Sequence, residues 1–414
     1  MVSNVRAASL IRGAALAALL FGTAACRGRP PMNNPDKVTF LVDSLRPAVE
    51  RATGLAFKTP PRAAVRTHDQ VRAYLMAKLD QELPPEKARG LQATYRLLGL
   101  LPDSLDLRAL LLDLFTEQVV GYYEPDSTML FVVPTADYTT LKTVVAHELV
   151  HALQHQYLDL DSIMRQTGDN DRLTAAQSIL EGQATLSGLQ VMVPDQNLFA
   201  MPEFWETYRD QFRKQQAEMP VFTKAPRLLR ESIIFPYLAG ADFIRWWRGS
   251  ELRDTLPYGP RMPVSTEQIL NPHRYGRGDQ PITLRFAAEE PGILYEDVLG
   301  EFEMRVLVAE LNNLAPTAEI GTPLALGWGG DRFRVYETPE GPAMLWYIAW
   351  DDTTARARFE GGAGARLEAR RPLGYRLEVT PLSLGAVPAT RVVIAPQPWS
   401  GWRHLAPVVI SRPQ

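Results

Sequence analysis

The sequence predicts an α+β fold, with a mostly helical part that contains a small β-hairpin and a β-rich C-terminal subdomain after it. Apolar residues recur at helical spacing over most of residues 36–270. Beyond about residue 321 the pattern changes to short β-prone runs. The chain of 414 residues exceeds one average domain. We therefore expect one large helical domain at 36–320 and a β-rich subdomain at 321–414.

The N-terminus has the order of a secretory signal peptide. Arg6 and Arg12 precede a short apolar stretch at residues 13–22, and small residues follow it. The stretch is too short to span a bilayer comfortably as a permanent helix. We predict that residues 1–25 are a signal peptide and that the protein is exported.

Cys26 is the only cysteine of the chain and directly follows the small residues at the end of this signal. It resembles the lipid-modified cysteine of a bacterial lipobox, although Thr23 stands where that motif usually has an aliphatic residue. An ordinary cleaved signal with an incidental cysteine is the alternative. We expect lipidation of Cys26, a tether at 26–35, and a place in the bacterial cell envelope facing the periplasm.

The segment up to about residue 118 is predicted to be helical and carries no recognisable site. Thr67 and Gln70 have the spacing of a capping box, and Pro84-Pro85 ends the helix that they open. Two further helices are expected at 86–98 and 104–118.

A β-hairpin is expected next, because β-like runs at 119–124 and 128–133 are joined by Pro125-Asp126-Ser127. A helix follows at about 139–157, and a second long helix is expected to begin near Thr174. Further helices and β-prone runs complete the chain. They are helices at 199–216, 226–247 (interrupted by Pro236) and 265–270, and β-prone runs at 332–337, 343–350, 375–379 and 390–394.

The sequence His-Glu-Leu-Val-His at residues 147–151 carries the clearest chemistry. His147 and His151 are four residues apart, so both imidazoles lie on one face of a helix and can bind one metal ion. Zinc lowers the pKa of a bound water to about 7, and Glu148 can then accept its proton as a general base. Histidines that only make hydrogen bonds in a protein core are the alternative, which the apolar flanks of the motif disfavour.

A zinc site of this kind needs a third protein ligand. His155 is excluded, because eight residues of helix separate it from His147 by about 12 Å. Glu181 is the better candidate, since 29 residues (152–180) separate it from His151 and allow an antiparallel return. An exposed helical glutamate is the alternative. Small residues near Glu181 would let the two helices approach closely: Gly182, Ala184 and Gly188.

This combination of His147, Glu148 and His151 with Glu181 on a later helix resembles the gluzincin group of metallopeptidases, the thermolysin-like zincins. Residues 147–154, 181–185 and Gly-Trp-Gly-Gly-Asp at 327–331 together resemble a set of bacterial exported proteins with this site. The resemblance implies a zincin-like fold for 36–320, Zn2+ as cofactor and a peptide or protein substrate. Thr185 stands where the thermolysin-like enzymes have an aspartate that orients the first histidine, and Asp159 or Asp161 is a substitute.

The same resemblance implies two further features. In zincins an edge strand before the histidine helix binds the substrate by strand addition, and 128–133 is in the right place, although an ordinary hairpin is nearly as good a reading. A donor must also stabilise the oxyanion. Tyr237, His273 and Tyr275 are candidates, and we favour Tyr275 or His273.

We therefore expect an exported zinc metallopeptidase in which Glu148 activates a zinc-bound water. A non-catalytic envelope lipoprotein that binds through this fold, or a zinc hydrolase of a non-peptide amide, are the alternatives. The net charge of -3 gives no reason to expect a nucleic-acid partner. Contact with a membrane is expected only through the lipid anchor, and the sequence does not fix an oligomeric state.

Overall fold

The computed structural model describes residues 34–133, 138–164, 168–198, 201–315, 320 and 323–411. The predicted signal peptide, Cys26 and nearly all of the predicted tether lie outside the described residues, so these remain predictions. Within the described ranges, no helix combines the length and the apolarity that a membrane crossing needs. The division of the chain into domains also remains a prediction.

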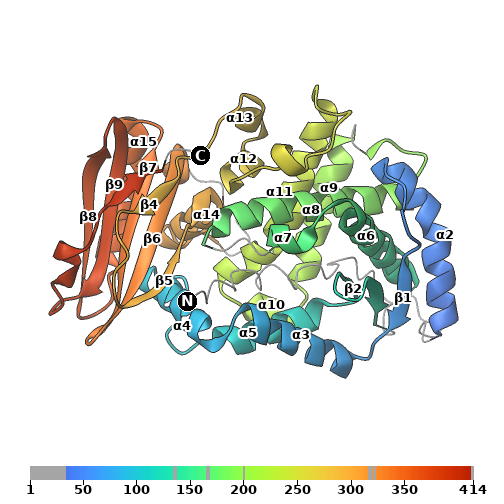
Figure 1. The fold of residues 1–414 in the computed structure, drawn as a ribbon, viewed down its shortest axis with the longest axis horizontal. Coiled ribbons are helices and arrows are strands. Elements are labelled where there is room, and N and C mark those ends of the chain that lie inside the picture. The colour runs from blue at the N-terminus through green and yellow to red at the C-terminus, as the bar shows by residue number, and fades with distance from the viewer. Residues whose placement is uncertain are drawn as a thin grey trace.

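The predicted fold class is confirmed, because a mostly helical part with a small mixed sheet precedes an antiparallel β-rich region (Figure 1). The helices before residue 300 are α2 (Pro35–Thr53), α3 (His68–Glu82), α4 (Pro85–Leu97), α5 (Leu107–Gln118), α6 (Tyr138–Tyr157), α7 (Leu160–Met164), α8 (Asn170–Met192), α9 (Pro202–Gln216), α10 (Pro220–Lys224), α11 (Arg227–Gly249), α12 (Thr266–Leu270) and α13 (Pro272–Gly276). The predicted capping box opens α3, with reciprocal hydrogen bonds between Thr67 and Gln70.

The small sheet contains β1 (Arg62–Val65), β2 (Gly121–Glu124) and β3 (Met129–Val132) in the order β1-β3-β2. β2 and β3 form the predicted hairpin, and β1 pairs with β3 in parallel. The expectation that 128–133 supplies an edge strand is wrong, because β3 is paired on both sides. A strand with partners on both sides has no free backbone groups for a substrate.

Three long helices form the centre of the helical part, with α8 between α6 and α11 (Figure 1). α8 is buried along almost its entire length. It begins at Asn170, capped by the side chain of Asp169, rather than near Thr174 as predicted. α11 continues through Pro236, so the predicted interruption there is also wrong.

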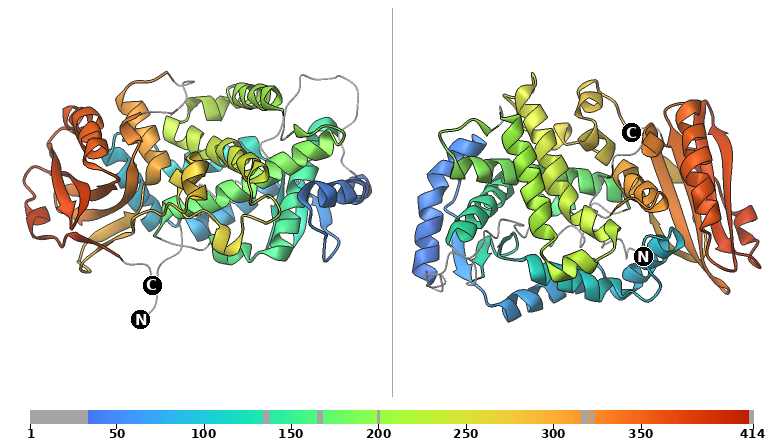
Figure 2. Two further views of the ribbon diagram at one scale, coloured as in Figure 1. Left: turned by 90° about the horizontal axis from the view of Figure 1, so that it is seen from above. Right: turned by 180° about the vertical axis from the view of Figure 1, so that it is seen from behind.

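The C-terminal region is a five-stranded antiparallel sheet in the order β5-β6-β7-β9-β8, which lies at one end of the molecule (Figure 2). A separate two-stranded sheet is formed by β4 and β10. The elements of this region are β4 (Leu284–Phe286), β5 (Ile293–Asp297), α14 (Gly300–Leu311), β6 (Trp328–Thr338), β7 (Gly341–Trp350), α15 (Thr353–Phe359), α16 (Ala365–Ala369), β8 (Tyr375–Leu384), β9 (Val387–Pro396) and β10 (Val408–Ile410).

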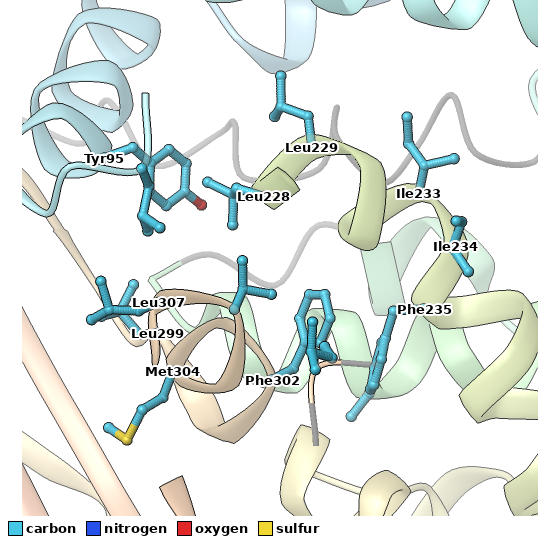
Figure 3. Close-up of a cluster of buried hydrophobic side chains, with 14 of the residues drawn as sticks. Tyr95, Leu228, Leu229, Ile233, Ile234, Phe235, Leu299, Phe302, Met304 and Leu307 are labelled. Atoms are coloured by element: carbon cyan, nitrogen blue, oxygen red, sulfur yellow. The ribbon is translucent and has the colours of Figure 1, made fainter. Parts of the chain in front are cut away.

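A continuous hydrophobic core joins the helical part to this sheet. Figure 3 shows Tyr95 of α4, the apolar side chains of the first turns of α11 and Phe302 of α14 in one buried cluster, with Phe302 beside Phe235. The rings of Phe235 and Phe302 stack at 4.1 Å between centroids. α14 therefore connects the helices that carry the candidate site to the sheet.

Asp331 gives the 327–331 motif a structural role. Its buried carboxylate accepts hydrogen bonds from the backbone amides of Leu299 and Gly300 and from the indole groups of Trp328 and Trp346. Four donors satisfy a charge that would otherwise be costly to bury. The motif thus fixes the N-terminus of α14 against the sheet.

Candidate metal centre

Three side chains from two helices bring one ligand atom each to a common point. His147 Nε2 lies 3.0 Å from His151 Nε2 and 3.2 Å from Glu181 Oε2, and the last two atoms are 3.4 Å apart. Tetrahedral zinc bonds of about 2.0–2.2 Å separate neighbouring ligand atoms by about 3.3 Å. The spacing therefore fits one metal ion, and His147, His151 and Glu181 could hold it.

Helix geometry brings these atoms together. His147 and His151 are one turn apart on α6, and Glu181 lies in the middle of α8. Gly188 lies against the backbone of His147, where an added Cβ would be 3.5 Å from its Cα. This small residue faces the histidine helix, as expected.

Gly182 does not face the histidine helix, contrary to the expectation from sequence. It lies against Gly240 of α11, where an added Cβ would be only 2.2 Å from the carbonyl carbon of Gly240. The reciprocal Cβ on Gly240 would lie 1.9 Å from the oxygen of Ser178. The backbones of α8 and α11 thus touch directly beside Glu181.

The cluster carries the electrostatics of a cation site. Burial raises the pKa of Glu181, but the two imidazoles lower it by more, so the net shift of this pKa is downward. Burial lowers the pKa of His147. For His151 the Glu181 carboxylate outweighs burial and raises the pKa to about 9. A buried carboxylate that holds a proton on a neighbouring imidazole can exchange that proton for a metal ion.

Glu148 is also fully buried, and its Oε2 accepts a hydrogen bond of 2.7 Å from the backbone amide of Tyr123 in β2. The hydroxyl of Tyr123 contacts His155 Nδ1 at 2.9 Å. His155 therefore contacts Tyr123, whose backbone amide holds Glu148, and lies outside the three-residue cluster. The sequence had excluded it as a ligand on helix geometry.

Tyr237 of α11 lies beside the cluster. Its ring stacks on that of His147 at 6.0 Å between centroids. Burial raises the pKa of Tyr237, and the charges of Glu181 and Glu148 and a hydrogen bond to Glu181 raise it further. Its hydroxyl therefore keeps its proton.

Tyr275 and His273, which the sequence favoured as oxyanion donors, lie on α13. The hydroxyl of Tyr275 donates to the carbonyl of Arg261 at 2.7 Å, and its ring contacts Phe243 edge-on at 5.3 Å. The ring of His273 contacts Trp246. Phe243 and Trp246 follow Tyr237 on α11 by six and nine residues, which is about 9–14 Å of helix. Neither Tyr275 nor His273 has a described contact with the metal cluster.

The groups that orient the ligands also differ from expectation. Asp159 accepts from the amide of Ser162 and caps α7, and the side chain of Asp161 lies outside the described residues. Gln154 instead contacts His151 Nδ1, at 2.8 Å. The sequence placed Gln154 within the motif but assigned it no role. Its other partners, Leu180 and Gln183, belong to α8, and the sequence does not show that they lie beside it.

A family described as a domain of unknown function (DUF8575) matches residues 291–382. That segment contains β5 to β7 and most of β8, and it excludes the metal cluster. No curated protein matches the chain. Among solved structures, a protein from Chloroflexus aurantiacus described as a candidate hydrolase with a novel fold matches at 16% identity and a TM-score of 0.39, covering 67% of this chain and 99% of the other. A match at this level does not establish a shared fold.

Proposed function

We propose that this protein is an exported zinc-dependent metallopeptidase of gluzincin type. One observation carries the proposal: His147, His151 and Glu181 converge with Glu148 buried on the same turn of α6. The donor set of two imidazoles and one carboxylate suits zinc and leaves a fourth position for water or substrate. Glu181 is fully buried and its Oε1 has no hydrogen-bond partner among the described residues, so a bound cation would offset the cost of burying this carboxylate.

The zinc ion would acidify water and polarise the substrate carbonyl. Glu148 accepts the proton of the attacking water and transfers it to the leaving amine. The Tyr123 amide fixes the orientation of its carboxylate. We assign the Tyr237 hydroxyl, which contacts Glu181 in this structure, the role of donating a hydrogen bond to the developing oxyanion.

Access to the centre requires movement, because His147, Glu148, His151 and Glu181 are all 0% exposed. A substrate can therefore reach the cluster only if a covering segment opens, as in enzymes with closing lids. Closure would exclude water other than the reacting molecule and strengthen the electrostatic interactions within the site.

Two other functions share these residues. A non-catalytic lipoprotein would use the fold only for binding, and a zinc hydrolase could cleave a non-peptide amide. The first is disfavoured because Glu148 is a buried carboxylate held beside the ligands, which costs stability and serves no purpose in a scaffold.

The decisive comparison is between the parent protein and a Glu148→Gln variant, tested on a broad peptide library. We expect the variant to retain its metal and to lose hydrolysis, since an amide cannot accept the proton. Removal of the metal with a chelator should have the same effect, and restored zinc should reverse it. A Glu148→Gln variant as active as the parent contradicts the proposal. Hydrolysis of cell-wall amides without peptide cleavage supports the third function.

A further inference from the structure

The side chain of Gln154 connects a metal ligand on α6 to the helix that carries the other one. Its Oε1 contacts His151 Nδ1 at 2.8 Å, and its Nε2 contacts the carbonyl oxygen of Leu180 at 3.0 Å and Gln183 Oε1 at 2.9 Å. Gln154 is buried, with 1% of its surface exposed. Every polar atom of this amide therefore has a protein partner.

The contact with Leu180 fixes which end of the amide faces His151. A backbone carbonyl only accepts hydrogen bonds, so the group that faces it must be the amino group of Gln154. The opposite end is then the amide oxygen, which also only accepts. His151 must therefore donate from Nδ1, and in the neutral ring this leaves the lone pair on Nε2. That lone pair lies on the side of the ring that faces His147 and Glu181.

Gln183 extends the connection. Its Oε1 accepts from Gln154 and also from the hydroxyl of Tyr258. Gln183 lies two residues after Glu181 on α8, so these hydrogen bonds fix His151 relative to the helix of the carboxylate ligand. His147 differs, because its Nδ1 has no partner in the described part of the chain. His151 is thus the histidine ligand whose ring is oriented through its second nitrogen.

We propose that Gln154 is the positioning residue of the metal centre, which holds His151 in the Nδ1-protonated tautomer and aims Nε2 at the ion. The proposal rests on the proposed function, since it requires that the cluster binds a metal. Partners of this kind change metal affinity about 10–100-fold when removed. Gln154 contacts no substrate in this role and acts only through His151.

The test compares two substitutions that separate the two faces of this side chain. Gln154→Met keeps the volume and removes the acceptor for His151 Nδ1. Gln154→Glu keeps an acceptor for His151 but loses the donors to Leu180 and Gln183. Gln216→Met, at a buried glutamine of α9 that is 3% exposed, is the matched control for loss of a buried amide. Zinc affinity is measured by chelator competition, and the visible spectrum of the Co2+-loaded protein reports ligand geometry.

We expect Gln154→Met to weaken zinc binding about 10–100-fold and to alter the cobalt spectrum. Gln154→Glu should stay within about tenfold of the parent, because a carboxylate also accepts from Nδ1 and increases the basicity of the imidazole. Gln216→Met should bind zinc as the parent does.

Equal losses in Gln154→Met and Gln154→Glu would overturn the inference, since the residue would then act by joining α6 to α8. Unchanged affinity in Gln154→Met would overturn it as well, and both results leave the proposed function intact. A parent protein that binds no zinc overturns the two together. If both Gln154 variants fail to fold, the 15N NMR signals of His151 in the zinc-loaded parent decide, because zinc replaces the proton on the nitrogen that binds it. A protonated Nδ1 supports the inference, and zinc bound at Nδ1 with a protonated Nε2 contradicts it.

Discussion

Gly240 allows α11 to lie against α8 at the turn that carries Glu181. A Cβ added at this position would be 1.9 Å from the oxygen of Ser178, whereas ordinary van der Waals contact begins at 3.4 Å. The neighbouring atoms are backbone, which cannot turn aside as a flexible side chain can. Gly240→Ala therefore forces the two helices about 1.5 Å apart, or distorts one of them.

The expected cost follows from that displacement. Overpacking of a core costs about 1–3 kcal/mol, and occasionally more, so we expect Gly240→Ala to lower the free energy of unfolding by about 3 kcal/mol. The metal site should suffer further, because ligand distances tolerate only about 0.2 Å. Tyr237 lies one turn before Gly240, and Glu181 lies next to Gly182, so both move with the helices. A displacement of about 1 Å can cost about 100-fold in activity.

Urea unfolding of the metal-free protein and zinc affinity by chelator competition measure these two effects separately. Gly249→Ala is the matched control on the same helix, because nothing lies within 4 Å of its added Cβ. It should bind zinc as the parent does and gain up to about 1 kcal/mol, since alanine favours helix over glycine. Gly240→Ala with the stability and zinc affinity of the parent would refute this account of the helix contact.

Further predictions concern Tyr237 as oxyanion donor, the buried carboxyl group of Glu267, and Cys26 near the N-terminus. Tyr237→Phe should lower kcat about 100-fold while zinc content stays unchanged, and steady-state kinetics with metal analysis checks both; an unaltered kcat would exclude it as oxyanion donor. Burial, followed by the charge of Glu301, raises the pKa of Glu267 to about 9, above its usual 4.5. Its contribution to stability is therefore present below about pH 4.5 and is lost as the pH rises to about 9. Urea unfolding across this range should show a flatter pH dependence for Glu267→Gln than for the parent, and identical slopes would contradict the shift. Cys26→Ser should abolish incorporation of a labelled fatty acid in cells, and undiminished labelling would refute lipidation at Cys26.

The features that the sequence predicted depend on local spacing. His147 and His151 face the same way because they are one helical turn apart, and this holds wherever the helix packs. Glu181 was found because its apolar neighbours marked a buried helix, on which a carboxylate needs a partner. The change of pattern beyond residue 321 likewise indicated a β-rich region.

The features that the sequence missed depend on contacts between distant segments. β3 is central rather than an edge, because β1, about 65 residues earlier, pairs with it in parallel. A side chain at Gly182 would collide with the backbone of Gly240, and the sequence around either glycine does not show that the two lie together. Tyr237 lies at the site and Tyr275 does not, because the packing of α11 and α13 against other helices decides this and spacing along the chain does not. The role of Gln154 likewise depends on the carbonyl of Leu180, which only the packing of α6 on α8 brings within reach.

The central claim is that His147, His151 and Glu181 hold one metal ion. Zinc content per chain, measured by mass spectrometry on protein purified without added metal and again after zinc loading and dialysis, tests it most directly. We expect about one zinc per chain in the parent and almost none in Glu181→Ala and in His151→Ala. A parent protein that retains no zinc or other transition metal after loading, or variants that retain as much as the parent, would contradict the account.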